Sequence, residues 1–188
     1  MRGSIGQNVR VWASTLVLAL GLLAGLNACG GGGDTRSTGK AAAEDFDAKA
    51  SDFHNLHTMT KVRGFFIDNR RGHLDEALAV ANAPNGGTYP VGTIIQLLPQ
   101  EAMIKRRKGF NPTTKDWEFF SLEVSSRGTV IKVRGKDVVN RFAMNCAACH
   151  SAADPKFDFV CEETHGCAPL PIGPEIFRLL QQADPRPQ

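Results

Sequence analysis

The most regular pattern in the chain is the alternation of side-chain types between residues 117 and 124. A period of two residues predicts a β-strand, because successive side chains of a strand point to opposite faces of the sheet. One face is expected to carry Phe120, Leu122 and Val124, and the other Trp117, Phe119 and Ser121. Residues 129–133 follow a turn signal at 126–128 and are predicted to form the antiparallel partner strand.

Other segments show strand-like or helix-like spacing. Residues 62–67 are strand-like, and so are residues 92–98, which Pro99 closes; both segments predict strands. Helices are predicted over residues 41–57 (Phe46, Ala50, Phe53 and His57 at helical spacing), over residues 73–83, and from Pro174 onward, with Ile176, Leu179 and Leu180 in one stripe. The pattern therefore predicts a largely antiparallel β domain with helices beside it.

The first thirty residues have the pattern of an export signal. Arg2 and Arg10 precede an uncharged apolar run, residues 11–26, which is short and interrupted for a membrane span. The sequence Leu-Asn-Ala-Cys at 26–29 resembles the cleavage site of a bacterial lipoprotein. The resemblance implies a signal peptide over residues 1–28 and a lipid on Cys29. An ordinary secretory peptide with an incidental cysteine is the alternative.

A lipid on Cys29 would anchor the exported chain to a membrane. Several acyl chains on one residue give stable anchoring, and residues 29–40 read as a glycine-rich tether. By resemblance to lipoprotein sorting rules, Gly30 directly after Cys29 favours the outer membrane, with the domain in the periplasm.

Residues 146–150, Cys-Ala-Ala-Cys-His, carry the most specific chemical signature of the chain. Cys-x-x-Cys-His is the attachment motif of a c-type haem, in which two thiols form thioethers and the histidine supplies the proximal nitrogen to iron. One turn of helix sets Cys146 and Cys149 on the same side, roughly 5–6 Å apart. The segment is expected to be a helix or tight turn that binds one haem c covalently through Cys146 and Cys149, with His150 on the iron. A redox dithiol and half of a zinc site are the alternatives.

Two of the five cysteines then remain, Cys161 and Cys167. In an oxidising compartment such a pair usually forms a disulfide, and Gly166 permits the tight reversal that closes the loop. The alternative is a metal site that uses His165.

Length and charge set further limits. The chain has 188 residues, and without its signal it is of single-domain length, so residues 41–188 are expected to form one haem domain. The formal net charge is only +3, and no basic stripe with interleaved aromatic residues indicates a nucleic-acid partner. The basic run at 105–108 is interpreted as a solvated turn, with docking to an acidic redox partner protein as the alternative.

The position of the haem motif narrows the class of cytochrome. No methionine follows His150, so the methionine–histidine ligation of small electron-transfer cytochromes is not expected. The strand-like patterns at 92–98 and 117–124 argue against a four-helix bundle. Both observations favour a haem attached at the C-terminal end of a β-rich domain.

Five segments, in this order and spacing, resemble the cytochrome P-460 and cytochrome c′-β superfamily. They are Val-Arg-Gly-Phe-Phe-Ile-Asp-Asn at 62–69, Tyr-Pro-Val-Gly-Thr-Ile-Ile at 89–95, Asp-Trp-Glu-Phe-Phe at 116–120, the motif at 146–150, and Asp-Phe-Val at 158–160. The resemblance implies an α+β fold: a twisted antiparallel β-sheet with flanking helices and a C-terminal c-type haem attachment segment. It also implies His150 as the proximal ligand.

The resemblance implies two kinds of activity. Members with a lysine cross-linked to the haem oxidise hydroxylamine or nitric oxide, whereas members without that link bind small gaseous ligands. The strand after Gly92 and Thr93 contains no lysine, and the next one is Lys105 beyond Pro99. This departure puts the hydroxylamine-oxidising activity in doubt.

The groups opposite His150 would decide the chemistry, because distal polarity and access separate ligand binding, activation and electron transfer. An apolar distal wall could come from Phe65, Phe66, Trp117, Phe119 and Phe120, although ordinary sheet core explains each of them equally well. Candidate sixth ligands are His54, His57, His73, His165, Met59 and Met103, whereas Met144 lies too near Cys146 in the chain to reach the far face of the haem. Candidate bases are Glu118, Glu123, Asp154 and Asp158, among which the sequence does not choose.

Three hypotheses follow. The first is a tethered periplasmic haem protein that transfers electrons to a redox partner or binds a small ligand such as nitric oxide. The second is an oxidoreductase acting on hydroxylamine or nitrogen oxides, whose catalytic residues the sequence does not identify. The third is an interaction protein in which the haem is structural.

Overall fold

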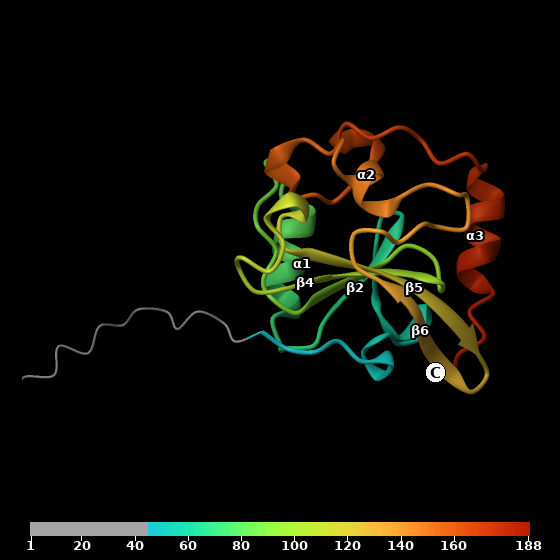
Figure 1. Ribbon diagram of the computed structural model, residues 1–188. Coiled ribbons are helices and arrows are strands. Elements are labelled where there is room, and N and C mark those ends of the chain that lie inside the picture. The colour runs from blue at the N-terminus through green and yellow to red at the C-terminus, as the bar shows by residue number, and fades with distance from the viewer. Residues whose placement is uncertain (1–44) are drawn as a thin grey trace, which may run out of the picture. The chain divides into compact units, whose positions relative to one another are not determined.

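The computed structural model describes residues 45–188, and its central feature is a six-stranded antiparallel sheet in which each strand pairs with the next in the chain (Figure 1). The strands are β1 (Thr60–Val62), β2 (Phe65–Asn69), β3 (Thr93–Gln96), β4 (Glu101–Lys105), β5 (Trp117–Ser125) and β6 (Gly128–Arg134). Helix α1 (Leu74–Asn82) lies between β2 and β3, and α2 (Cys146–His150) and α3 (Pro174–Gln182) follow the sheet. The prediction of an α+β fold with an antiparallel sheet is confirmed.

The predicted signal peptide, the tether and Cys29 lie outside the described residues. Within residues 45–188, no helix has the length and apolar character needed to cross a bilayer.

The alternation in β5 supplies both faces of the sheet with core residues, as the sequence predicts. On the first face, Trp117 and Phe119 join Phe65, Ile67, Ile95 and Met103 beneath α1 and residues 138–160. On the second face, Phe120 and Leu122 join Phe66, Ile94 and Ile104 beneath residues 48–59. The β5–β6 pairing is also confirmed, with Val124 opposite Thr129 and one irregularity between Ser121 and Leu122.

The helix predicted over residues 41–57 is wrong for the part of that range that the structure describes. The chain forms two short 3-10 helices instead, Ala50–Asp52 and Leu56–Thr58. The side chain of Asn55 accepts a hydrogen bond from the backbone N–H of His57 at 2.8 Å and caps the second of them. Local bonds of this kind compete with an α-helix. Phe53 and Leu56 are buried against the second face without helical periodicity.

The strand predicted over residues 62–67 is in fact a hairpin. Val62 ends β1 and Phe65 begins β2, and between them Arg63 adopts a left-handed conformation with φ 48°. The prediction fails here because residues 63 and 64 carry only one turn signal, Gly64, inside an apolar run.

The basic run at 105–108 is not a solvated turn in its first half. Lys105 ends β4, a strand that was not predicted, and both Lys105 and Arg106 are only 5% exposed. Their side chains point to opposite faces, where Lys105 pairs with Asp158 and Arg106 pairs with Glu118 and Asp45. Buried charges of this kind require paired partners.

The two remaining helix predictions are confirmed in position. Helix α1 covers most of residues 73–83, and α3 begins at Pro174. The expected stripe of α3 is not a buried one, since Ile176 and Leu179 are 52% and 57% exposed. The chain after α3 returns to the sheet through Arg186, which is buried beside Asp184 and donates to the backbone oxygen of Phe53 at 3.0 Å.

Candidate cofactor site

Helix α2 brings the residues of the Cys-x-x-Cys-His motif together. It begins at Cys146, and the Asn145 side chain caps it by accepting a hydrogen bond from the backbone N–H of Ala148 at 2.8 Å. Cys146 and Cys149 are free thiols, partly buried. His150 follows directly after Cys149, and all three side chains line one cavity beside the sheet.

That space is a cavity with two adjoining parts, here called the α2 cavity. The sheet part has a volume of about 70 Å³ and is bounded by Ile95, Met103 and Phe119. The loop part has a volume of about 410 Å³ and extends to Pro169, Leu170 and Phe177. Six residues line both parts: Phe65, Leu97, Glu101, Cys146, His150 and Cys161. The larger part alone is within the size range of ligand-binding sites, about 300–1,000 Å³.

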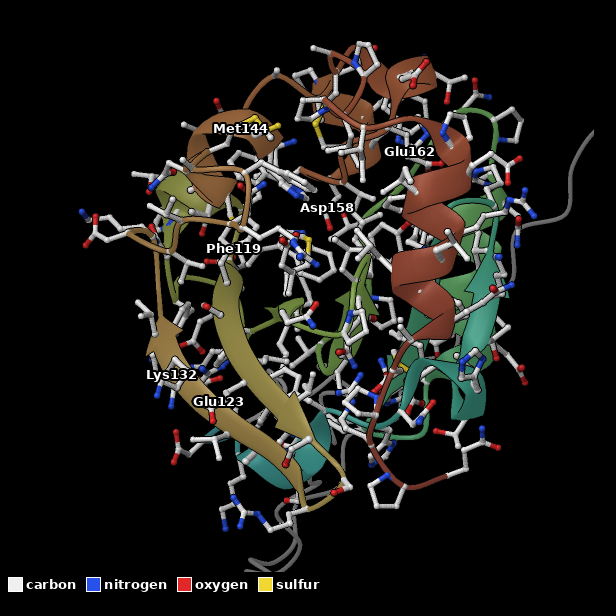
Figure 2. The ribbon with its side chains drawn as sticks, turned by 90° about the vertical axis from the view of Figure 1, so that its right-hand side faces the viewer. Phe119, Glu123, Lys132, Met144, Asp158 and Glu162 are labelled. Carbon is white, nitrogen blue, oxygen red and sulfur yellow. A yellow bond between two sulfur atoms is a disulfide. The ribbon has the colours of Figure 1, made fainter. Side chains whose placement is uncertain are left out.

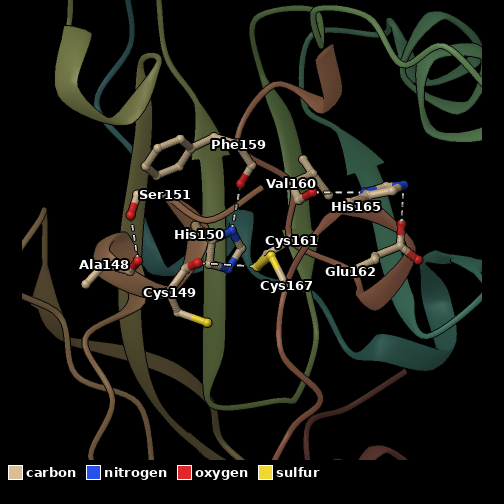
Figure 3. Close-up of a disulfide and its surroundings, with 10 residues drawn as sticks. All are labelled: Ala148, Cys149, His150, Ser151, Phe159, Val160, Cys161, Glu162, His165 and Cys167. Carbon is tan, nitrogen blue, oxygen red and sulfur yellow. Dashed lines mark hydrogen bonds and ion pairs between the residues drawn. A yellow bond between two sulfur atoms is a disulfide. The ribbon is translucent and has the colours of Figure 1, made fainter. Parts of the chain in front are cut away.

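The tautomer of His150 is fixed by its environment. Its Nδ1 lies 2.8 Å from the backbone oxygen of Phe159 (Figure 3). Because a carbonyl oxygen can only accept, Nδ1 carries the hydrogen and Nε2 keeps its lone pair. The ring packs edge-on against Phe119, with centroids 5.0 Å apart. Burial lowers the pKa of His150, which favours the neutral form that binds metals.

The chemistry of Cys146 argues against the redox-dithiol alternative. Burial raises the pKa of the Cys146 thiol to about 12, and the neighbouring acidic groups Glu101 and Cys149 add to the effect. Reactive cysteines of Cys-x-x-Cys motifs have lowered pKa values, since the thiolate is the nucleophile. Cys146 is therefore a protonated thiol at neutral pH.

Cys161 and Cys167 are joined by a disulfide, with their Cα atoms 5.7 Å apart. The Cys161 sulfur also lies 3.4 Å from the backbone oxygen of Cys149, a van der Waals contact because a bonded sulfur carries no hydrogen. His165, within the loop, is buried, and its Nδ1 lies 3.0 Å from the Val160 oxygen (Figure 3). Among residues 45–188 no group of three or more His, Cys, Asp or Glu side chains is arranged to hold a metal ion.

Of the residues considered for an apolar distal wall, three line the cavity, namely Phe65, Phe119 and Phe120. Trp117 and Phe66 belong to the sheet core and are not among the residues that line the cavity. Of the candidate sixth ligands, Met103 lines the sheet part. His54 and His73 lie instead beside Asp68 and Glu76.

The carboxylates singled out from the sequence lie elsewhere. Glu118 is paired with Arg106 and Arg134 on the second face, and Glu123 pairs with Lys132 at the surface of the hairpin (Figure 2). Asp154 caps a 3-10 helix, and Asp158 pairs with Lys105.

Glu101, which sequence reasoning missed, lines both parts of the cavity. It begins β4 and points to the same face as Met103. Burial raises the pKa of Glu101. The backbone N–H of Arg141, which donates to the Glu101 carboxylate at 3.4 Å, opposes this rise. The signal that could have revealed this residue is the alternation of Glu101, Met103 and Lys105 with Ala102 and Ile104.

No protein-family model, no curated protein and no solved structure matches the chain. The chemistry of the site must therefore follow from its own residues.

Proposed function

We propose that the protein is a c-type haem protein, with one haem attached through Cys146 and Cys149 and with His150 as the axial ligand of its iron. The observation that carries the proposal is the donor set. Two unpaired thiols one helical turn apart and an imidazole with its Nε2 lone pair available line one cavity. This is the set of groups that c-type attachment requires. The resemblance to the cytochrome P-460 and cytochrome c′-β superfamily supports the same proposal.

A bound haem would supply an iron centre that exchanges electrons and accepts a small ligand. The residues of the chain would set its surroundings. The Phe159 carbonyl orients His150, and Phe65, Ile95 and Phe119 exclude water from the sheet part of the cavity. A mostly apolar wall favours electron transfer or the binding of a small neutral molecule such as nitric oxide.

One observation favours the alternative, an oxidoreductase acting on hydroxylamine or nitric oxide. Oxidation of hydroxylamine releases protons, so it needs a base near the substrate, and Glu101 is a carboxyl group on the cavity wall. The lysine cross-link of such enzymes has no counterpart among the described residues that line the cavity. Lys105, the first lysine after Thr93 in the chain, is paired with Asp158.

The decisive experiment is expression of the full chain in a bacterium that attaches c-type haem. We expect one covalent haem in the purified protein, seen as a mass increase and as a c-type band in the reduced spectrum. Loss of the haem in the Cys146→Ala and Cys149→Ala variants would support the proposal. Undiminished covalent haem in Cys146→Ala, or none in the parent protein, would overturn it. The Cys161→Ser/Cys167→Ser double variant is the matched control, because it removes two sulfurs from the same cavity wall.

The spectrum also separates the candidate activities. A reduced protein that binds carbon monoxide or nitric oxide supports ligand binding, whereas a strongly red-shifted Soret band supports the cross-linked enzyme. A six-coordinate low-spin spectrum that carbon monoxide does not change would leave electron transfer or a structural haem. Met103→Leu would then show whether Met103 is the sixth ligand.

We further propose that the chain is exported and carried on a lipid at Cys29, with the outer membrane favoured. The support is the sequence of residues 1–30: the positive residues, the apolar run and the Leu-Asn-Ala-Cys-Gly segment. Labelling with palmitate should be lost in Cys29→Ser, and retention of the label would contradict the anchor.

A further inference from the structure

The residues Asp158, Phe159 and Val160 connect three separate parts of the molecule through their carbonyl groups. The Asp158 oxygen accepts from Trp117 Nε1 of β5 at 2.6 Å. The Phe159 oxygen accepts from His150 Nδ1 at 2.8 Å, and the Val160 oxygen lies 3.0 Å from His165 Nδ1 in the disulfide loop. Three consecutive carbonyls thus meet three ring nitrogens.

The backbone here is in a sparsely populated conformation. Asp158 and Phe159 have φ values of 53° and 71°, in the left-handed region that side chains other than glycine rarely adopt. Two such residues in succession persist only where the surrounding contacts hold them. The contacts of the Asp158 side chain contribute to holding this conformation.

Asp158 is held by a buried ion pair. Lys105 Nζ lies 2.8 Å from both carboxylate oxygens, and both side chains are only 6% exposed. The backbone N–H of Tyr89 donates to the same carboxylate at 2.9 Å. Figure 2 shows Asp158 and Phe119, both buried, between the sheet and the C-terminal segments.

The ion pair and the indole act from one position in the sheet. Lys105 and Trp117 are directly paired across β4 and β5. One binds the Asp158 side chain and the other binds its backbone oxygen. Burial lowers the pKa of Lys105 and raises that of Asp158, and the attraction between the two charges opposes both shifts.

We infer that Lys105 and Asp158 are positioning residues for His150. Together with Trp117 they fix the left-handed turn at 158–159, and the turn fixes the Phe159 carbonyl that receives the His150 Nδ1–H. This inference rests on the proposed function only for the consequence at the iron.

The consequence follows from the hydrogen bond. A carbonyl that accepts from Nδ1–H raises the basicity of an imidazole and strengthens its donation to a metal. Stronger donation favours ferric iron. When the carbonyl moves away, the reduction potential should rise and the iron–histidine bond should weaken.

The test compares Lys105→Met and Asp158→Asn with the parent holoprotein. We expect haem to remain attached, the reduction potential to rise, and the iron–histidine stretching frequency of the reduced protein to fall in resonance Raman spectra. Asp158→Asn keeps the shape of the side chain and should show a smaller shift in the same direction. It also serves where Lys105→Met fails to fold. Unchanged potential and frequency in the variants would overturn the inference.

Arg106→Met is the matched control. It breaks a comparably buried ion pair, with Glu118, on the second face of the sheet. We expect an unchanged reduction potential and stretching frequency for this variant, and a shift equal to that of Lys105→Met would contradict the positioning role.

A parent protein without haem would refute the proposed function and leave the positioning role open to a separate measurement. Nitrogen-15 NMR of the haem-free chain should then show a slowly exchanging His150 Nδ1–H that Lys105→Met removes. Its persistence in the variant would refute the positioning role.

Discussion

The rings of Phe157 and His165 stack almost parallel, with centroids 3.6 Å apart and 9° between their planes. The stack ties the loop closed by Cys161 and Cys167 to the segment that precedes Asp158. The disulfide therefore reinforces a loop that side-chain packing already holds in place. Removing the disulfide should for this reason cause only a limited loss of stability.

We predict a moderate loss of stability in the Cys161→Ser/Cys167→Ser variant. The two cysteines are separated by six positions, and a loop that short gives a loop-closure contribution of about 2 kcal/mol. Urea denaturation of the parent and double variant measures the loss. A collapse of the fold would show that the Phe157–His165 stack contributes little.

The stability of the protein should depend on pH through Glu101. Burial raises the pKa of this carboxyl above its usual 4.5, so the folded chain binds the proton more tightly than the unfolded chain. The stabilisation that follows from this tighter proton binding is fully present below pH 4.5, and it is lost as the pH rises through the pKa of Glu101 in the folded chain. Glu101→Gln should therefore gain stability relative to the parent between pH 4 and pH 7.

Melting temperatures of the haem-free protein at the two pH values would show this gain. Glu123→Gln is the control, because Glu123 is exposed on the β5–β6 hairpin beside Lys132 (Figure 2). A gain no larger for Glu101→Gln than for Glu123→Gln would mean that Glu101 is well hydrated.

Gly86, in the loop after α1, lies against Lys156 and Phe157. Its φ is +66°, and a methyl group there would lie 2.2 Å from the Lys156 backbone oxygen. Gly86→Ala should cost about 3 kcal/mol, from left-handed strain and from the clash together. Gly72→Ala, at φ +80° with no atom within 4 Å, should cost only about 1 kcal/mol. Equal losses in urea denaturation would mean that the loop moves aside freely.

The chain after α3 depends on one buried ion pair. The side chains of Arg186 and Asp184 are 2% and 0% exposed, so Arg186→Met leaves a buried charge without its partner. The expected loss is about 3–5 kcal/mol. Arg178→Met removes an exposed pair with Glu175 and should cost less than about 1 kcal/mol. Similar melting temperatures for the two variants would contradict this account.

The sequence predicts the fold where periodicity and burial agree. In β5, Trp117 and Phe119 belong to one core cluster and Phe120 and Leu122 to the other, so the two faces of the strand could be assigned in advance. The helix predicted over residues 41–57 was wrong because Phe53 and Leu56 pack against the second face of the sheet, and the local spacing of apolar residues does not reveal that surface. Strand β4 was not predicted because Lys105 resembles a surface residue in the sequence. Its burial is explained only by its partner Asp158, which lies fifty-three positions further along the chain.

The candidate site also contains residues that the sequence predicts and residues that it does not. Its donor groups, Cys146, Cys149 and His150, are neighbours in the chain and form one local motif. Glu101 and Met103 reach the cavity only because the sheet carries β4 beneath α2. The role of the Phe159 carbonyl could not be predicted from a sequence motif, because every residue has a backbone oxygen.

The strictly sequential order of the six strands has a consequence for how the protein folds. Each strand pairs with its predecessor, so most pairings join residues close in the chain and carry a low loop-closure cost. The core of the second face is complete by residue 131, whereas the first face also needs Val138, Phe159 and Val160. During refolding, amide protons of β4 and β5 should become protected from hydrogen exchange before those of residues 146–160. The Cys146 and Cys149 thiols of α2 would then come to lie beside a sheet that has already formed.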